Sequence, residues 1–371
     1  MKKVLHLRAS GALLGAEQVV LELCRNSPKY GYESALCVPV DNGSGEPELI
    51  RAARAQGTEV LPVSFSSPFS VRSIATVREC LRTQGADVIH THGYREDFYA
   101  LGLGGNARLV ATNHLWKTTT RRLRFYAGMD AYLLRTFDHV VAVSGNVRDQ
   151  MLAKGISGQL VSVIPNGISP IEPDTNDSGD LIAEFPSLRN KTVLVSVSTL
   201  TPEKGHMYAL EALKSLSDEG LDFHWLVAGE GRCESQLRSQ ADALGLSQRV
   251  TFAGHRSDVK RILRAADIFL MPSLAEGLPI AMLEAMWCGP AIVATRVGDI
   301  EFALADGQCG FLADPGDAGS LESALRQALS SAGSRKSVTD SALQRVSEKL
   351  SADAMTRSYC SLYDKLLSVK P

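Results

Sequence analysis

The sequence lacks long apolar runs, and its charges nearly cancel. Its 371 residues carry 39 Lys and Arg against 41 Asp and Glu, a formal net charge of −2. A balanced charge indicates no nucleic-acid partner, and no apolar stretch nears the roughly 20 residues that a membrane-spanning helix needs. The opening segment MKKVLHLRASG lacks a signal-peptide core because His6 and Arg8 interrupt its short apolar run. These absences favour a cytoplasmic protein.

Cysteine patterns typical of disulfide scaffolds and zinc sites are also missing. The seven cysteines are an odd number, and no Cys-x-x-Cys occurs. Free thiols in a reducing compartment are therefore expected. A chain of this length is too long for one hydrophobic core, so two domains are predicted.

Short apolar runs alternate with helix-length segments in both halves of the chain, which is typical of parallel strands buried on both faces. The runs predicted as strands are residues 4–7, 34–38, 87–92, 108–112, 139–144, 161–165, 192–198, 224–230, 250–254, 267–273, 291–295 and 310–314. The polar segment SPIEPDTNDSGD (169–180) interrupts the alternation and has the composition of a linker. The sequence thus predicts an α/β protein with two doubly wound, Rossmann-like parallel-sheet domains.

The domain boundaries follow from the position of the linker. We expect an N-terminal domain over residues 1–172, a linker over 173–190 and a C-terminal domain over 191–351. The last helix, within residues 352–371, is expected to return to the N-terminal domain.

Two glutamates in PSLAEGLPIAMLEAMWCGPAIVAT (272–295) are the first candidates for chemistry. Pro279 is predicted at the first position of a helix that Gly289 ends. This puts Glu276 on the preceding loop and Glu284 inside the helix. Eight residues at helical rise separate the two acids by roughly 12 Å, further than the roughly 5–9.5 Å between the carboxyls of a glycosidase. Two solvated surface acids are the alternative interpretation.

The surroundings of the two acids indicate a polyhydroxylated, anionic ligand. A carboxylate accepts hydrogen bonds from two neighbouring hydroxyls, so each acid suits the diol of a ribose or a hexose. Ligands of open α/β sheets bind beyond the carboxyl ends of strands, and the backbone N–H groups that open a helix suit an anion. The candidates for binding a sugar nucleotide here are Glu276, Gly277, Leu278, Pro279 and Glu284.

Further candidates follow other strand ends. Lys204 in VSTLTPEKG suits a diphosphate because an ammonium offers a point charge and three donors, although a solvated loop lysine is the simpler interpretation. Gly15 in LLGAEQVV allows close approach to a helix start, or only a tight turn. His114 in LVATNHLWK is on its own a structural histidine. His90 and His92 in DVIHTHGY, without an acidic cluster, favour structural hydrogen bonds over a metal site.

Taken together, these segments resemble one family. The segment SLAEGLPIAMLEAMWCGPAIVATRVGDIEFALADGQCGFLADPGD is similar to the signature of retaining glycosyltransferases of the GT-B fold, family 4 (glycosyl transferases group 1). The segments LVAGEGRCESQLRSQADALGL, VSTLTPEKG, IPNG, AVSGNVRD, DVIHTHG and LLGAEQVV extend the likeness over nearly the whole chain, in the family's order. The resemblance implies a GT-B fold, in which two Rossmann-like domains face a cleft.

The resemblance also implies a role for each candidate. Glu284 would hold the nucleotide ribose, and Glu276 would contact the donor sugar. Lys204 would bind the donor diphosphate, His114 would face the reacting hexose, and Gly15 would contact the donor. We expect transfer of a hexose from a nucleotide-diphosphate sugar to a hydroxyl acceptor, with retention of anomeric configuration. Fixed donors replace a divalent metal in such a site, so no metal or other cofactor is expected.

One position departs from the family pattern. An arginine is expected five residues before Lys204, and Thr199 stands there. The charge of the leaving diphosphate would be less fully compensated unless Arg8, Arg232 or Arg256 substitutes. Thr199 stays among the donor-binding candidates, and it leaves open a catalytically weak or silent sugar-nucleotide-binding protein.

Two other enzyme classes use similar domains. A sugar-nucleotide epimerase of the same fold would need no acceptor. An NAD-dependent dehydrogenase is disfavoured because GEGRCE (229–234) lacks the third glycine of the dinucleotide fingerprint, and no G-x-G-x-x-G follows the first predicted strand.

The acceptor side is indicated by a basic segment, Arg108–Arg124. No acid occurs from Phe98 through Met129. Such a segment suits anionic lipid headgroups at the inner membrane face, an anionic acceptor, or a solvated helix with one buried face. The family resemblance implies a lipid-linked or growing glycan as acceptor. The basic residues after Arg108 and the apolar residues between them are Leu115, Trp116, Lys117, Arg121, Arg122, Leu123, Arg124 and Phe125.

Overall fold

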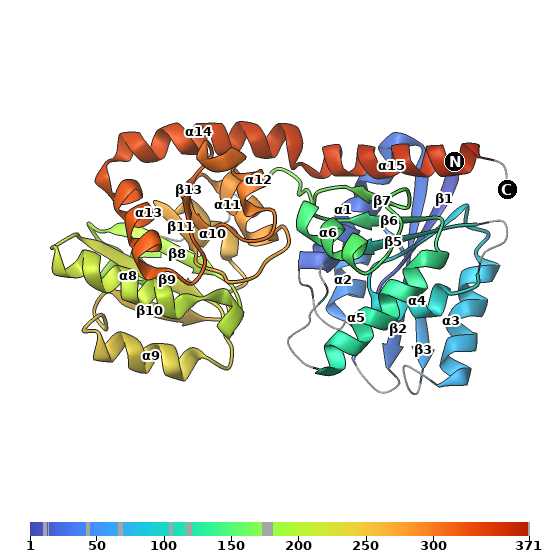
Figure 1. The fold of residues 1–371 in the computed structure, drawn as a ribbon, viewed down its shortest axis with the longest axis horizontal. Helices are drawn as coiled ribbons and strands as arrows, with labels where there is room; N and C mark the ends of the chain where they lie inside the picture. The colour runs from blue at the N-terminus through green and yellow to red at the C-terminus, as the bar shows by residue number, and fades with distance from the viewer. Residues whose placement is uncertain are drawn as a thin grey trace. The chain divides into compact units, whose positions relative to one another are not determined.

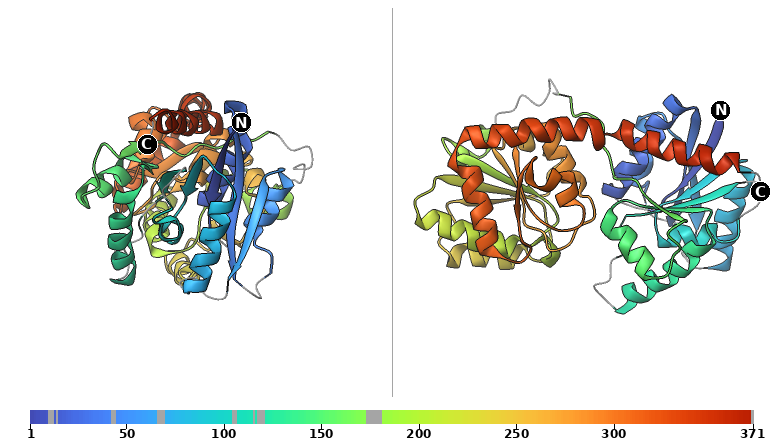
Figure 2. Two further views of the ribbon diagram at one scale, coloured as in Figure 1. Left: turned by 90° about the vertical axis from the view of Figure 1, so that its right-hand side faces the viewer. Right: turned by 45° about the horizontal axis from the view of Figure 1, so that its top comes forward.

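A computed structural model describes residues 1–9, 13, 15–41, 45–65, 70–103, 107–114, 116, 121–172 and 181–369, without the side chains of residues 65 and 121–123. The chain divides into two compact units, each with its own parallel sheet and covering helices (Figures 1 and 2). The first unit comprises Met1–Ser169 and Ser351–Pro371, and the second comprises Pro170–Leu350. The two sheets confirm the predicted pair of doubly wound α/β domains.

The sheet of the first unit has the strand order β3-β2-β1-β4-β5-β6-β7, and all its registered pairs are parallel. Its strands are β1 (Lys2–Leu7), β2 (Tyr32–Asp41), β3 (Glu59–Phe65), β4 (Val88–Thr91), β5 (Arg108–Asn113), β6 (His139–Ala142) and β7 (Val161–Val163). Its helices are α1 (Gly15–Asn26), η1 (Ser27–Tyr30), α2 (Glu48–Ala55), α3 (Val71–Thr83), α4 (Tyr94–Ala100), α5 (Arg121–Leu133), η2 (Leu134–Thr136), α6 (Gly145–Ala153) and α15 (Ala352–Ser368).

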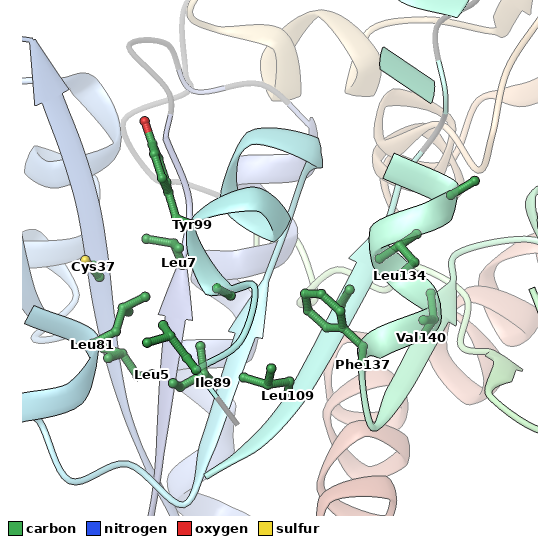
Figure 3. Close-up of a cluster of buried hydrophobic side chains, with 14 of the residues drawn as sticks. Leu5, Leu7, Cys37, Leu81, Ile89, Tyr99, Leu109, Leu134, Phe137 and Val140 are labelled. Atoms are coloured by element: carbon green, nitrogen blue, oxygen red, sulfur yellow. The ribbon is translucent and has the colours of Figure 1, made fainter. Parts of the chain in front are cut away.

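Apolar side chains from neighbouring strands form the core of this unit. Leu5, Ile89 and Leu109 come from β1, β4 and β5 and are buried together with Leu81 and Phe137 (Figure 3). Burying a side chain of this size stabilises the fold by about 1.5–3 kcal/mol. This packing fixes the carboxyl ends of the central strands, where the candidate residues lie.

Strand β3 is absent from the predicted strands, because Pro62 interrupts its apolar run. Proline lacks the N–H of a ladder hydrogen bond and is tolerated mainly at sheet edges. Strand β3 is the edge strand of its sheet, and Val38 of β2 lies opposite Pro62. The edge position therefore explains why a strand forms despite the proline.

The sheet of the second unit has the parallel order β10-β9-β8-β11-β12-β13. Its strands are β8 (Thr192–Val197), β9 (Phe223–Ala228), β10 (Val250–Gly254), β11 (Ile268–Met271), β12 (Ala291–Thr295) and β13 (Phe311–Ala313). Its helices are α7 (Leu181–Glu184), η3 (Pro186–Leu188), η4 (Pro202–Lys204), α8 (His206–Asp218), α9 (Glu234–Ala243), α10 (Val259–Arg264), α11 (Ile280–Cys288), α12 (Ile300–Ala303), η5 (Ala305–Gly307), α13 (Ala318–Ser330) and α14 (Ala332–Lys349).

Part of the segment predicted as a linker is folded into the second unit. Residues 173–180 lie outside the described residues, whereas helix α7 and the η3 turn belong to the second unit. The polar composition of 169–180 therefore predicts a boundary, but the apolar residues that follow it already pack in the next unit.

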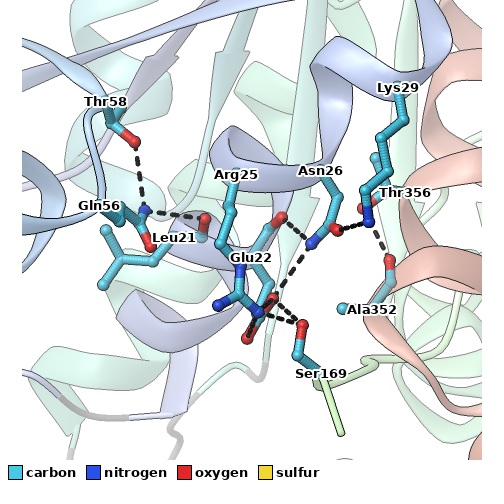
Figure 4. A network of polar contacts seen from close by, with 10 residues as sticks. All are labelled: Leu21, Glu22, Arg25, Asn26, Lys29, Gln56, Thr58, Ser169, Ala352 and Thr356. Atoms are coloured by element: carbon cyan, nitrogen blue, oxygen red, sulfur yellow. Dashed lines mark hydrogen bonds and ion pairs between the residues drawn. The ribbon is translucent and has the colours of Figure 1, made fainter.

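The chain returns to the first unit through α15, which packs on α1. The backbone N–H of Ala352 donates to the carbonyl oxygen of Ile168 at 2.9 Å. The Ser169 hydroxyl donates to Glu22 Oε2 of α1 at 2.7 Å (Figure 4). The points where the chain leaves and re-enters this unit are therefore joined to each other and to α1.

Two further sequence predictions concern the cysteines and membrane-spanning helices. All seven cysteines are free thiols, as their number and spacing predict. Within the described ranges, no helix combines the length and the apolar content that crossing a bilayer requires.

Candidate functional site

Each sheet has one position where the strand order reverses, and the candidate residues gather at these two positions. In the first unit the reversal lies between β1 and β4, and in the second between β8 and β11. Ligands of open α/β sheets bind beyond the carboxyl ends of the strands at such a switch point. The two switch points are therefore described in turn.

In the second unit, Lys204 and Glu276 form an ion pair. Lys204 Nζ lies 2.6 Å from Glu276 Oε1, and the Ser273 hydroxyl donates to the same oxygen at 2.7 Å. The Glu276 side chain is 9% exposed and that of Lys204 is 22% exposed. The structure thus brings together two residues that the sequence predicts separately, and the carboxylate balances the charge of the lysine.

The loop that carries Lys204 is held by Gly205. Gly205 has φ +65°, and a Cβ there would lie 2.0 Å from the carbonyl oxygen of Pro272. The Leu274 N–H also donates to the carbonyl oxygen of Glu203 at 2.8 Å. The backbone after β8 thus lies directly against the backbone after β11, and only glycine fits at this contact.

The loop that carries Glu276 is held from its other side by Gly298, which follows β12. Gly298 has φ +58°, and a Cβ there would lie 2.3 Å from the carbonyl oxygen of Glu276. The Asp299 N–H donates to the carbonyl oxygen of Gly277 at 2.9 Å. Glu276 is therefore positioned by backbone contacts on both sides.

Helix α11 carries Glu284 and begins one residue later than predicted, because Pro279 is its N-cap. It ends at Cys288, and Gly289 has φ +103°, as predicted. Leu278 is buried, and residues 277–279 are not helical, so the helical rise used to separate the two glutamates holds only from Ile280 onward.

The Glu284 carboxyl is partly buried but lacks a donor. No described residue donates a hydrogen bond to it. Burial raises the pKa of Glu284, and the charge of Lys260 opposes this shift. A partly buried carboxylate with free acceptor positions suits a ligand with hydroxyl groups.

Thr199 lies at the exposed tip that follows β8, and its carbonyl oxygen accepts from the Thr201 N–H at 3.1 Å. The side chain offers a hydroxyl but no charge. Thr199 therefore provides no cation at the position where the family resemblance implies an arginine.

Two of the three arginines considered as replacements are engaged elsewhere. Arg8 Nη2 lies 2.6 Å from Glu17 Oε1, and Arg256 Nη1 lies 2.6 Å from Glu184 Oε1. Arg232 is exposed, and no described residue forms an ion pair or hydrogen bond with its guanidinium.

The switch point of the first unit opens into a cavity of about 570 Å³. It is lined by residues of α1, α4, β5 and α5 and by residues that follow β1, β4 and β5. The charged and histidine side chains among them include Arg8, Glu17, His92, Asp97, His114 and Asp130. Helix α1 begins at Gly15, and its residues Ala16 and Glu17 line the cavity.

His114 is the predicted site residue that this cavity contains. Neither ring nitrogen has a hydrogen-bond partner among the described residues, and both are buried. Its ring stacks on His92 with centroids 5.9 Å apart. Burial, and secondarily the charge of Arg8, lowers the pKa of His114 to about 3. The imidazole is therefore neutral at physiological pH and offers one donor and one acceptor.

A third histidine, His6, lies beside His90 and His92. The sequence analysis did not predict that His6 belongs to this cluster. His6 Nδ1 lies 3.0 Å from His92 Nε2. His90 is hydrogen-bonded through both nitrogens, to the Tyr363 and Thr112 hydroxyls at 2.7 Å each. One nitrogen from each ring lies within 4.8 Å of the others, but His90 would lose a hydroxyl partner by binding a metal. The observed contacts are those of the predicted structural role.

Two aspartates of the cavity form a buried carboxyl pair. Asp97 on α4 and Asp130 on α5 contact each other, and burial followed by this contact raises the pKa of Asp97. Burial also raises the pKa of Asp130, although the Trp116 Nε1–H donates to Asp130 Oδ2 at 2.6 Å. Asp97 and Asp130 are the acids directly before and after the acid-free stretch Phe98–Met129. The sequence therefore shows where they stand along the chain but not that they contact each other.

The described members of the predicted basic patch differ in exposure. Arg108 Nη1 lies 3.0 Å from Asp138 Oδ1, and Trp116 is buried. Arg124 and Phe125 are exposed on α5, with Phe125 68% exposed. The remaining predicted members lie outside the described residues or lack described side chains: Leu115, Lys117, Arg121, Arg122 and Leu123.

Comparisons with known proteins bear on the whole chain. Residues 14–171 match the family model Glycosyltransferase Family 4, and residues 179–345 match Glycosyl transferases group 1. The chain is 26% identical over 338 residues to the UDP-Gal:alpha-D-GlcNAc-diphosphoundecaprenol alpha-1,3-galactosyltransferase of Escherichia coli, covering 87% of each chain. It is 29% identical over 324 residues to the phosphatidyl-myo-inositol mannosyltransferase of Mycobacterium leprae, covering 84% of this chain and 82% of that protein.

Solved structures share the fold. Anabaena Alr3699/HepE in complex with UDP and glucose superposes with a TM-score of 0.83 at 19% identity, over 98% of this chain and 100% of that one. The lipopolysaccharide outer core galactosyltransferase WaaB superposes with a TM-score of 0.76 at 17% identity, over 98% and 100% of the two chains. Two family models in series and this fold show that the chain belongs to the glycosyl transferases group 1, with the GT-B fold.

Proposed function

We propose that the protein transfers a hexose from a nucleotide-diphosphate sugar to a hydroxyl of a lipid-linked or growing glycan, with retention of anomeric configuration and without a metal ion. The observation that carries the proposal is the Lys204–Glu276 pair at the switch point of the second unit, together with the carboxylate of Glu284, to which no residue in the described part of the chain donates. The two relatives named above support the acceptor class, because their names specify a diphosphoundecaprenol-linked sugar and phosphatidyl-myo-inositol.

The second unit would bind the donor. Glu284 would accept hydrogen bonds from the ribose hydroxyls, and Glu276 would accept from the hexose hydroxyls. The Lys204 ammonium has three donors, of which Glu276 uses one. Lys204 is thus able to contact the diphosphate while the ion pair stays intact. The backbone N–H groups of Gly277 and Leu278, on the loop before α11, would add fixed dipoles directed at the same negative charge, and Pro279, which has no N–H, would lead into the helix.

The first unit would bind the acceptor in its cavity, and His114 would contact the donor hexose. A neutral imidazole and a carboxyl pair provide both donors and acceptors for hydroxyl groups. The aromatic faces of Trp116 and Tyr126 also line this cavity. The backbone near Gly15, at the start of α1, would lie close to the transferred sugar.

In the proposed step, the bond between the anomeric carbon and the diphosphate oxygen breaks. A bond from the acceptor oxygen to the same carbon forms on the same face, and the acceptor proton passes to the departing phosphate oxygen. Lys204 and the helix-start dipoles stabilise the charge that develops on the leaving group. Neutral hydrogen-bonding groups such as His114 orient the hexose without adding charge.

We also propose peripheral contact with an anionic membrane through α5. Exposed Phe125 lies next to Arg124, and Tyr132 on the same helix is 67% exposed. An interfacial helix with exposed aromatic and basic residues is suited to a headgroup layer. Flotation with phosphatidylglycerol and phosphatidylcholine liposomes at low salt tests this, and equal recovery from both would contradict it.

The function is tested by thermal shift with UDP-, GDP- and ADP-sugars, followed by NMR of the product formed with a lipid-linked glycan. The expected product has the anomeric configuration of the donor, and its formation persists in EDTA. A product of inverted configuration would contradict retention, and loss of activity in EDTA would contradict metal independence. Nucleotide binding without transfer to any acceptor would favour the silent binding protein that Thr199 leaves open.

A further inference from the structure

We propose that Arg232 supplies the second positive charge for the donor diphosphate, in place of the arginine that Thr199 replaces. The inference rests on the proposed function and assigns one residue to the diphosphate part of that site. It concerns the loop that follows the neighbouring strand β9, whereas Thr199 lies in the loop that follows β8.

The loop with Arg232 lies along the loop that leads to Lys204. A Cβ on Gly231 would lie 2.3 Å from the carbonyl oxygen of Leu200. The Leu200 N–H donates to the carbonyl oxygen of Glu230 at 2.9 Å, and the Cys233 N–H donates to that of Leu200 at 3.0 Å. Strands β9, β8 and β11 are neighbours in the sheet. Arg232, Lys204 and Glu276 therefore follow three adjacent strand ends.

The charge of Arg232 acts on Glu203, the residue before Lys204. Burial raises the pKa of Glu203, but hydrogen bonds with its own backbone and with Thr201, followed by the charges of Arg232 and Lys204, outweigh burial and lower this pKa. The guanidinium and the ammonium thus act on a common point at this end of the sheet.

A second cation is needed because the Lys204 charge is balanced by Glu276. A nucleoside diphosphate carries more negative charge than this neutral pair compensates. Two other described cations of the second unit are engaged: Arg296 pairs with Glu301, and Lys260 acts on Glu284. The guanidinium of Arg232 has no hydrogen-bond or ion-pair partner among the residues that the structure describes, and its planar fork matches two phosphate oxygens.

The test compares diphosphate and nucleoside binding by calorimetry, using UDP, GDP and ADP with uridine, guanosine and adenosine. Arg232→Ala should weaken binding of the preferred diphosphate about tenfold or more, since a hydrogen bond to a charged group is lost. Binding of the matching nucleoside should change less than about twofold on the same argument. Arg232→Lys should retain part of the affinity, and Thr199→Arg should restore it in the Arg232→Ala background.

The matched control is Arg238→Ala, which removes one positive charge from α9, where Arg238 pairs with Glu234. It should leave diphosphate affinity unchanged. If the wild type binds the diphosphate and Arg232→Ala binds it with the same affinity, the role of Arg232 is overturned and the proposed function stays intact. Equal losses for diphosphate and nucleoside, without rescue by Thr199→Arg, would also overturn it. A wild type that binds none of the nucleotides would overturn the proposed function and this inference together.

Discussion

The two units share an architecture, but their switch points differ in how charge is handled. In the first unit, β1 and β4 bring buried neutral histidines beside a carboxyl pair, and Arg8 is paired with Glu17. In the second unit, glycines hold the backbone loops together, and Lys204 and Arg232 lie near the surface. The same sheet topology thus provides an uncharged histidine cluster beside a cavity in one unit and an anion-directed edge in the other.

From this difference we propose a division of labour between the two units. Neutral imidazoles and carboxyls recognise hydroxyl groups by hydrogen bonding, whereas cations and backbone dipoles recognise phosphate. We therefore assign the diphosphate to the second unit and the acceptor to the first. Changes in the two units should separate phosphate binding from sugar recognition.

The largest expected effect is that of Lys204→Ala on turnover. Removing a donor directed at the leaving-group charge typically lowers kcat by about 10²–10³. Steady-state kinetics with the preferred sugar nucleotide measures this. Lys214→Ala is the control, because Lys214 pairs with Asp218 on α8 of the same unit. Wild-type turnover in the Lys204 variant would remove it from the mechanism.

The glycine contact in the second unit predicts a loss of stability in Gly205→Ala. A methyl there meets the Pro272 carbonyl oxygen and a left-handed φ, so we expect a loss of about 3 kcal/mol in the free energy of unfolding. Gly220→Ala is the matched control, because Gly220 has φ +82° with nothing within 4 Å of a Cβ. It should lose only about 1 kcal/mol. Equal losses in denaturant titrations would argue against the backbone contact.

The histidines of the first unit predict acid sensitivity. Burial lowers the pKa of His6 and of His114 to about 3, while the unfolded value is about 6.5. The neutral rings therefore support the fold fully above pH 6.5, and this support is lost as pH falls toward 3. Each histidine that binds a proton in the unfolded but not in the folded protein lowers the free energy of unfolding by at most about 1.4 kcal/mol per pH unit of acidification. Asp97 and Asp130, whose pKa values are raised by burial, act with the opposite sign.

The measurement is the midpoint of thermal unfolding between pH 7 and 4.5, in the wild type and in His114→Gln. The variant lacks one group that titrates on unfolding, so its midpoint should fall less steeply with acidification. A slope identical to the wild type would contradict the neutral, buried state of His114.

A smaller effect is expected for Glu284→Gln on nucleotide affinity. The amide replaces one acceptor oxygen with a donor, so binding of the preferred nucleoside diphosphate should weaken about tenfold. Calorimetry measures it, with Glu211→Gln on the exposed face of α8 as the control. Unchanged affinity would refute the ribose role.

The fold was predictable wherever an apolar run was uninterrupted. Twelve of the strand segments are visible as such runs, whereas β3 is hidden by Pro62, whose tolerance depends on an edge position that only the assembled sheet defines. Helix α11 was placed to within one residue because proline and glycine mark its ends.

The candidate site was predictable as residues but not as contacts. Lys204 and Glu276 were each identified, yet their ion pair joins residues 72 positions apart. His6 meets His92, and Asp97 meets Asp130, because β1 lies beside β4 and α4 packs against α5. Such contacts depend on strand order and packing, which local spacing does not determine.

The division of labour is tested most directly by calorimetric titration of the preferred nucleoside diphosphate into the wild type, Lys204→Ala and His114→Ala. We predict affinity reduced about tenfold or more in Lys204→Ala and unchanged within about twofold in His114→Ala. The opposite result, with nucleotide affinity lost in His114→Ala and kept in Lys204→Ala, would contradict the placement of the diphosphate on the second unit.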